Sequence, residues 1–82
     1  MYLHIGQDTV VREDDVVGIF DLDNTTVSPH TRKFLNQMEK SGGVITITED
    51  IPKSFVLVGK MDNIRVYLSQ ISTATLRKRN EK

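Results

Sequence analysis

The chain has 82 residues, with eleven basic and eleven acidic side chains, a formal net charge of zero and no cysteine. This length fits a single domain over residues 1–82, and so small a core often needs a disulfide, a metal or a partner subunit. The lack of cysteine excludes disulfides and thiolate metal sites, so we expect oligomerisation to supply that support. The sequence shows no basic-then-apolar leader and no apolar run of transmembrane length, which predicts a soluble, cytoplasmic protein without membrane contact.

The charges are segregated along the chain. Residues 1–27 contain six acids and one base, whereas residues 28–82 contain ten bases and five acids. Such segregation indicates either a basic surface for nucleic acid or an acidic surface that docks on the basic surface of a neighbour.

The first part of the chain predicts strands. MYLHIG (1–6) is a short strand that ends at a glycine, and DTVVRED (8–14) contains a second. DDVVGIFDL (14–22) is the strongest, because β-branched and aromatic residues run through it. In a regular strand, one face would carry Val16, Gly18, Phe20 and Leu22, and the other would carry Val17, Ile19, Asp21 and Asp23.

A helix is predicted within TTVSPHTRKFLNQMEKSGG (25–43). Ser28 is suited to the N-cap, because its hydroxyl can accept hydrogen bonds from first-turn amides. Pro29 suits the first helical position, where its missing N–H costs nothing. The pair Gly42-Gly43 predicts the end of the helix in a left-handed turn.

Three strands and a short helix follow. The strands are GVITIT (43–48), SFVLVG (54–59) and NIRVYLS (63–69), with the last two forming a hairpin. In the last strand we expect Ile64, Val66 and Leu68 to face inward and Arg65 and Tyr67 outward. STATLRKRNEK (72–82) predicts a terminal helix capped by Ser72 or Thr73.

These elements predict an α+β domain: a small, mostly antiparallel sheet with one central helix and a short C-terminal helix. The strand at 54–59 is apolar on both faces, which is typical of a central strand. Because one central helix can cover only one face, we expect a neighbouring subunit to cover the other, in a cyclic homo-oligomer.

Asp21-Leu22-Asp23-Asn24-Thr25 matches the Asp-x-Asp-x-Thr signature of the haloacid-dehalogenase phosphatases, in which the first Asp attacks phosphorus. Such an enzyme needs a parallel sheet of βαβ units of ~30 residues each, but only 59 residues follow Asp23 and they predict consecutive strands. That site also needs a separate Lys and, after another strand, an acidic pair. Lys53 and Lys60 are present, but Glu49-Asp50 precedes both and follows a segment that runs straight into another strand. We therefore interpret these residues as a turn and expect no enzyme, catalytic residue, metal, cofactor or small-molecule substrate. The phosphatase stays a remote alternative.

Several segments together, and in the right order, resemble one family. They are HIG (4–6), VVGIFD (16–21), SP (28–29), PKS (52–54) and STATLRKR (72–79). Over essentially its whole length the chain resembles the extracellular matrix regulatory protein B (RemB) family, relatives of the ring-forming DNA-binding regulator RemA. The resemblance implies a bacterial regulator of biofilm-matrix genes that assembles into rings.

The chain departs from RemA where RemA presents arginines to DNA. The matching places read EDDV (13–16) and DIPKS (50–54), in which only Lys53 is positively charged. The resemblance therefore supports the fold and the assembly more strongly than it supports DNA binding.

Two functional hypotheses remain side by side. The first is an oligomeric, DNA-associated regulator that contacts the phosphate backbone of duplex DNA. Its candidate DNA-binding residues are Lys53, Arg77, Lys78, Arg79 and Lys82, of which those near the C-terminus are expected to lie in a mobile tail. The second is an oligomeric protein–protein adaptor that does not bind DNA, because the acidic first third would repel phosphate and attract a basic partner. The candidate residues of the subunit interface are Glu13, Asp14, Asp15, Asp21, Asp23, Phe55 and Leu57.

Overall fold

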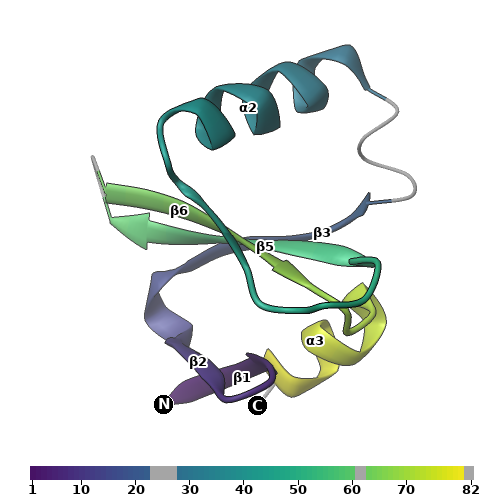
Figure 1. The fold of residues 1–82 in the computed structure, drawn as a ribbon. Coiled ribbons are helices and arrows are strands. Elements are labelled where there is room, and N and C mark those ends of the chain that lie inside the picture. Colours follow the sequence, from purple (N-terminus) through teal and green to yellow (C-terminus); the bar gives the residue numbers. More distant parts are fainter. Residues whose placement is uncertain (23–27, 61–62, 81–82) are drawn as a thin grey trace.

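The computed structural model describes residues 1–82 except 23–27, 61–62 and 81–82. In chain order, its elements are β1 (Tyr2–Gly6), β2 (Thr9–Arg12), η1 (Glu13–Asp15), β3 (Val16–Asp21), α2 (Pro29–Lys40), β4 (Val44–Thr46), β5 (Ser54–Lys60), β6 (Asn63–Ser69) and α3 (Thr73–Asn80) (Figure 1). Among the described residues, no helix is long and apolar enough to cross a membrane.

The strands form two sheets. β1 and β2 are an antiparallel hairpin, and the other four strands form a sheet in the order β3-β5-β6-β4. All neighbours are antiparallel except β4 and β6, which are parallel. The predicted α+β class, the mostly antiparallel sheet and the interior position of residues 54–59 are confirmed.

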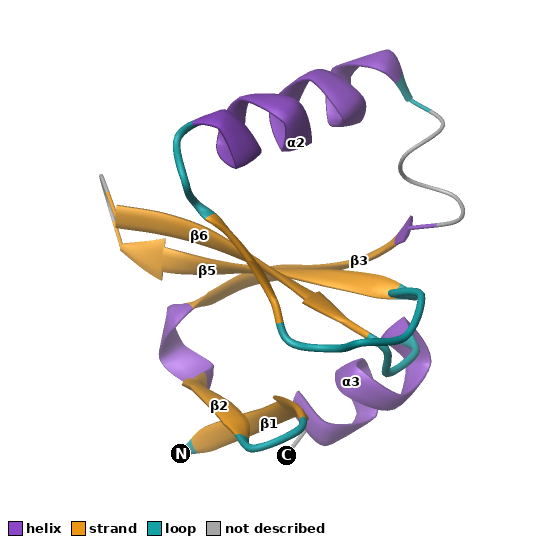
Figure 2. Cartoon of the chain, viewed as in Figure 1, coloured by secondary structure: helices purple, strands orange, loops and turns teal. Residues whose placement is uncertain are grey.

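The four-stranded sheet is covered on both faces by its own chain. α2 lies across one face, and the β1–β2 hairpin and α3 lie against the other (Figures 1 and 2). The expectation that a neighbouring subunit covers the second face is wrong. The reason is that elements at the two ends of the chain, β1–β2 and α3, meet and form a layer that covers this face.

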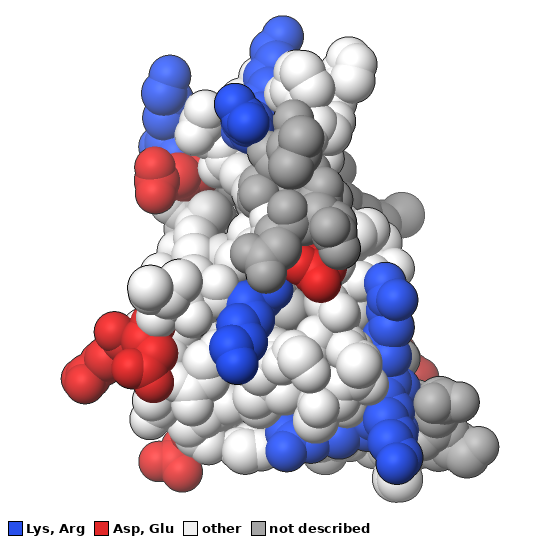
Figure 3. Space-filling model, turned by 90° about the vertical axis from the view of Figure 1, so that its right-hand side faces the viewer, with Lys and Arg blue, Asp and Glu red and all other residues white. Residues whose placement is uncertain are grey.

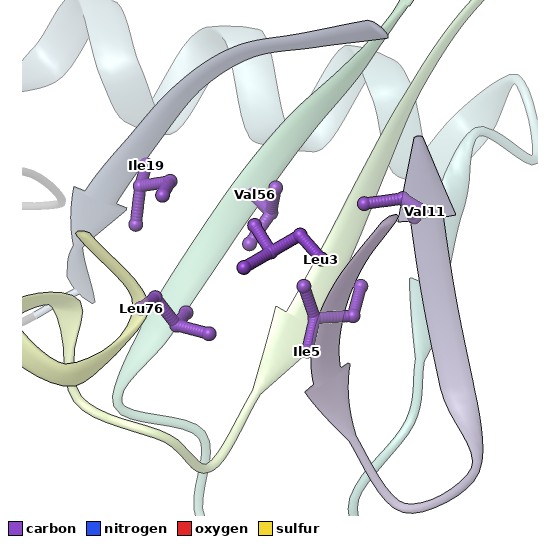
Figure 4. Packing of buried hydrophobic residues seen from close by; sticks show 6 residues of the cluster. All are labelled: Leu3, Ile5, Val11, Ile19, Val56 and Leu76. Atoms are coloured by element: carbon purple, nitrogen blue, oxygen red, sulfur yellow. The ribbon is translucent and has the colours of Figure 1, made fainter. Parts of the chain in front are cut away.

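The main core lies between the sheet and this layer of β1–β2 and α3 (Figure 4). Its buried members are Leu3, Ile5, Val11, Ile19, Val56 and Leu76. Tyr67 also packs against this cluster. The prediction that Tyr67 points outward is wrong, because β6 has a covered surface on both sides.

β3 does not alternate regularly. Its register against β5 shifts between Val16 and Gly18, so that Val16 pairs with Val58 and packs against the core. Val17 is left 61% exposed at this bulge. The predicted grouping of Val16 with Phe20 on one face is therefore wrong, since an extra residue in a bulge changes the face on which the preceding side chains lie.

The two helices begin differently. Ser28 has extended backbone angles before Pro29, but its side chain makes no capping hydrogen bond, so that part of the prediction is wrong. The amide of Thr75 donates to the Ser72 hydroxyl over 3.3 Å, which confirms the predicted cap of α3. After α2, Gly42 has a φ of +80°, as expected for a left-handed helix end.

Candidate functional site

The basic segment near the C-terminus belongs to a helix rather than a tail. Leu76 is fully buried in the core and fixes α3 against the sheet. Arg77, Lys78 and Arg79 follow it in the last turn and are exposed. The expectation of a mobile tail is therefore wrong for these three residues, and Lys82 lies outside the described part of the chain.

The two arginines of this segment donate hydrogen bonds to backbone carbonyls of edge strands. Arg77 Nη2 donates to the carbonyl of Ile19 in β3 over 3.0 Å, and Arg79 Nη1 donates to that of His4 in β1 over 3.1 Å. A guanidinium has five N–H donors, so donors remain for an outside acceptor. The hydrogen bonds therefore orient both cations at the surface without using up their capacity.

Lys53 lies near the beginning of α3. The hydroxyl of Ser54, the next residue, donates to the Ile71 carbonyl over 2.7 Å, just before α3 begins. Six residues of helix from Ser72 to Lys78 span about 9 Å at 1.5 Å per residue. Lys53 therefore lies beside the start of α3, whereas Arg77, Lys78 and Arg79 lie in its last turn.

Charge is unevenly distributed over this side of the molecule. Figure 3 shows basic side chains near the top, at the centre and along the lower right of the view, whereas most of the acidic side chains lie toward the left edge. The side chains of Lys53, Lys78 and Lys33 are all exposed. Basic side chains therefore occur at several places on this side of the molecule.

The candidate interface acids belong to other elements than the basic residues of α3. Glu13, Asp14 and Asp15 form the 3-10 turn η1 between β2 and β3. Asp21 ends β3, and Asp23 falls outside the described residues. Of the four that the structure describes, Asp14 is exposed and the other three are half-buried, which makes Asp14 the acid best placed to meet a partner.

Phe55 and Leu57 were predicted from the apolar strand to meet a neighbour. Phe55 is only 3% exposed and stacks on Phe20, with ring centroids 4.9 Å apart. Its burial is therefore already supplied within the chain. Leu57 is half-buried and lines an open groove of about 300 Å³ between α2 and strands β3 and β5, here called the α2 groove. The residues that line it are Phe20, His30, Thr31, Phe34, Phe55 and Leu57.

The α2 groove was not predicted from the sequence. Phe34, Leu35 and Met38 have the helical spacing of a stripe that packs on a sheet, yet no residue of α2 is fully buried. Sequence spacing gives the side of a helix that faces the sheet and not the depth to which it packs. The exposure of Ile51 was missed as well, although an isoleucine between Asp50 and Pro52 is an unusual residue for a loop.

The surroundings of Asp21 differ from those of a phosphatase nucleophile. It ends an edge strand of a mixed, mostly antiparallel sheet. Within the described ranges, no group of three or more His, Asp or Glu side chains could hold a metal ion. The rest of the Asp-x-Asp-x-Thr motif falls within residues 23–27, outside the described chain.

Comparison with known proteins assigns nearly the whole chain to one family. Residues 2–79 match the family RemA-like, described as extracellular matrix regulatory protein A-like. The chain is also similar to extracellular matrix regulatory protein B of Bacillus subtilis (strain 168), with 37% identity over 79 residues, which cover 96% of this chain and 89% of that protein. Both names describe regulatory proteins. The match spans every described strand and nearly all of α3, so the chain belongs to the RemA-like family.

Proposed function

We propose that this protein is a non-enzymatic bacterial regulator of extracellular-matrix (biofilm) genes, which acts in the cytoplasm as a homo-oligomer associated with duplex DNA. The observation that carries the proposal is the family match over residues 2–79. The 37% identity to a protein named for matrix regulation supports the same role.

The DNA contact would be made by the cations along α3. Exposed Lys53 and Lys78, with the oriented Arg77 and Arg79, offer several positive groups to phosphate oxygens. Contacts of this kind give affinity without reading sequence. One protomer offers few of them, and an oligomer multiplies them through effective concentration.

The experiment is a salt titration of duplex binding, with fluorescence anisotropy as the readout. Lys53 and Lys78 are the residues to replace, because both are exposed and neither change removes the carbonyl contacts of Arg77 and Arg79. The double variant Lys53→Gln, Lys78→Gln should bind more weakly, with the log–log salt slope reduced by about two units, one for each lost phosphate contact.

The matched control is Lys40→Gln, which removes an exposed lysine at the far end of α2. It lowers the net charge without touching α3, so its salt slope should equal that of the wild type. A slope reduced by about one unit in Lys40→Gln, half the change in the double variant, would mean that binding follows overall charge and would reject the α3 site.

The second candidate function is an oligomeric adaptor that binds protein and not DNA. The acidic η1 turn, with Asp14 exposed, favours it, because such a turn attracts a basic partner and repels phosphate. Wild-type protein that fails to bind duplex DNA even at about 50 mM salt would reject the DNA proposal and favour the adaptor.

A further inference from the structure

Two apolar features of this chain are open to solvent and carry opposite charges beside them. One is the Ile51 loop, residues 47–52, which ends before Lys53, and the other is the α2 groove. We propose that the Ile51 side chain of one copy enters the α2 groove of a second copy. The inference rests on the oligomer of the proposed function and names the surfaces that join its subunits.

Ile51 is the most exposed of the large hydrophobic side chains in the described chain, with 87% of its surface in contact with solvent. The loop around it is nevertheless ordered by hydrogen bonds. The buried Thr48 hydroxyl donates to Gln70 Oε1 over 2.6 Å and accepts from the Asp50 amide over 3.0 Å. The Lys53 amide donates to the Ser69 carbonyl over 2.8 Å. Ile51 is therefore presented on a fixed support, which lowers the entropy lost on binding.

The α2 groove offers a matching apolar recess. Its floor is the stacked pair Phe20 and Phe55, and Phe34 and Leu57 form its other apolar walls. With about 300 Å³ of space open to solvent, it has room for an aliphatic side chain. An aliphatic side chain and aromatic walls would both leave water in such a contact, which favours association.

The charges beside the two features have opposite signs. Glu49 and Asp50 are exposed next to Ile51. On the groove side, Lys33 is exposed on α2, next to Phe34, which lines the groove. Complementary charges at the edge of an apolar contact fix its orientation and disfavour other partners, and here both halves belong to the same chain.

The contact joins two different surfaces. The groove lies between α2 and strands β3 and β5, whereas the Ile51 loop connects β4 to β5 beyond the ends of these strands. A contact between unlike surfaces is heterologous, and its repetition gives a closed ring or an open filament according to the rotation between subunits. Each copy then uses its loop on one neighbour and its groove on the other.

The first experiment measures assembly of the full chain by size-exclusion chromatography with light scattering over a dilution series. Ile51→Ser removes the inserted side chain and should raise the dissociation constant by about 10- to 100-fold, the value of burying one aliphatic side chain. Val17→Ser is the matched control, because Val17 is also exposed but lies on the bulge of β3. It should assemble as the wild type does.

The second experiment mixes two defective chains. Leu57→Trp fills the groove and leaves the loop intact, whereas Ile51→Ser leaves the groove intact. Each alone should be monomeric at concentrations where the wild type assembles. Mixed, they should form a one-to-one heterodimer, because one functional loop then meets one functional groove.

The outcomes separate this inference from the proposed function. An oligomer that persists unchanged in Ile51→Ser overturns the inference and leaves the proposed oligomer standing. A wild-type protein that is monomeric throughout overturns both the inference and the oligomer, while the duplex titration decides DNA association independently. A variant mixture that stays monomeric, although the wild type assembles, also overturns the proposed pairing.

Discussion

The two faces of the four-stranded sheet are packed in different ways. On the face toward β1–β2 and α3, Ile5, Val56 and Leu76 are fully buried, and the Ser69 hydroxyl donates to the Ile5 carbonyl over 2.6 Å. On the face toward α2, the helix has no fully buried residue, and apolar spaces of about 300 and 170 Å³ lie along it. The first face holds the fold together, whereas the second leaves apolar surface available to a partner.

The largest expected difference between the faces comes from shortening a leucine in each helix. Leu76→Ala should lower the free energy of unfolding by about 2–5 kcal/mol, because it opens a cavity in a closed core. Leu35→Ala should cost less than about 2 kcal/mol, because Leu35 is half-buried beside an existing space. Urea denaturation of both variants measures the difference. Equal losses would show that α2 is packed as tightly as α3.

Enlarging neighbouring residues of β5 tests the same comparison in the opposite direction. Val56→Leu should destabilise by about 1–3 kcal/mol, because Val56 is fully buried in a filled core. Leu57→Trp adds more volume and should still cost less than about 1 kcal/mol, since the α2 groove can take the ring. Thermal unfolding of the two variants measures both losses of stability. A larger loss in Leu57→Trp than in Val56→Leu would contradict the difference between the two faces.

The smallest expected effect concerns the first turns of the helices. Ser72→Ala should cost about 1 kcal/mol, because the Ser72 hydroxyl accepts from the Thr75 amide. Ser28→Ala should change stability by no more than about 0.5 kcal/mol, because Ser28 makes no side-chain capping bond. Guanidinium denaturation compares them, and a loss in Ser28→Ala as large as that in Ser72→Ala would contradict the absence of a cap on α2.

The sequence by itself determined the kind and position of almost every element. β-branched runs, Pro29, Gly42 and Ser72 act over a few residues, so local stereochemistry was sufficient to predict strands, helix ends and the hairpin of β5 and β6. The α+β class followed from their order. The basic residues of the candidate site could also be recognised in the sequence as a run. The sequence did not show which groups they contact.

Only the tertiary structure decided what covers each face of the sheet. β1–β2 and α3 are separated by most of the chain, and their meeting depends on the burial of residues such as Leu3 and Leu76 in one core cluster, which no local pattern encodes. The same packing turns Arg77 and Arg79 toward the carbonyls of Ile19 and His4. A hydrophobic stripe shows that a surface will be buried, and the depth of burial depends on the summed packing of distant segments, which is why the closed core and the open α2 groove could not be told apart in advance.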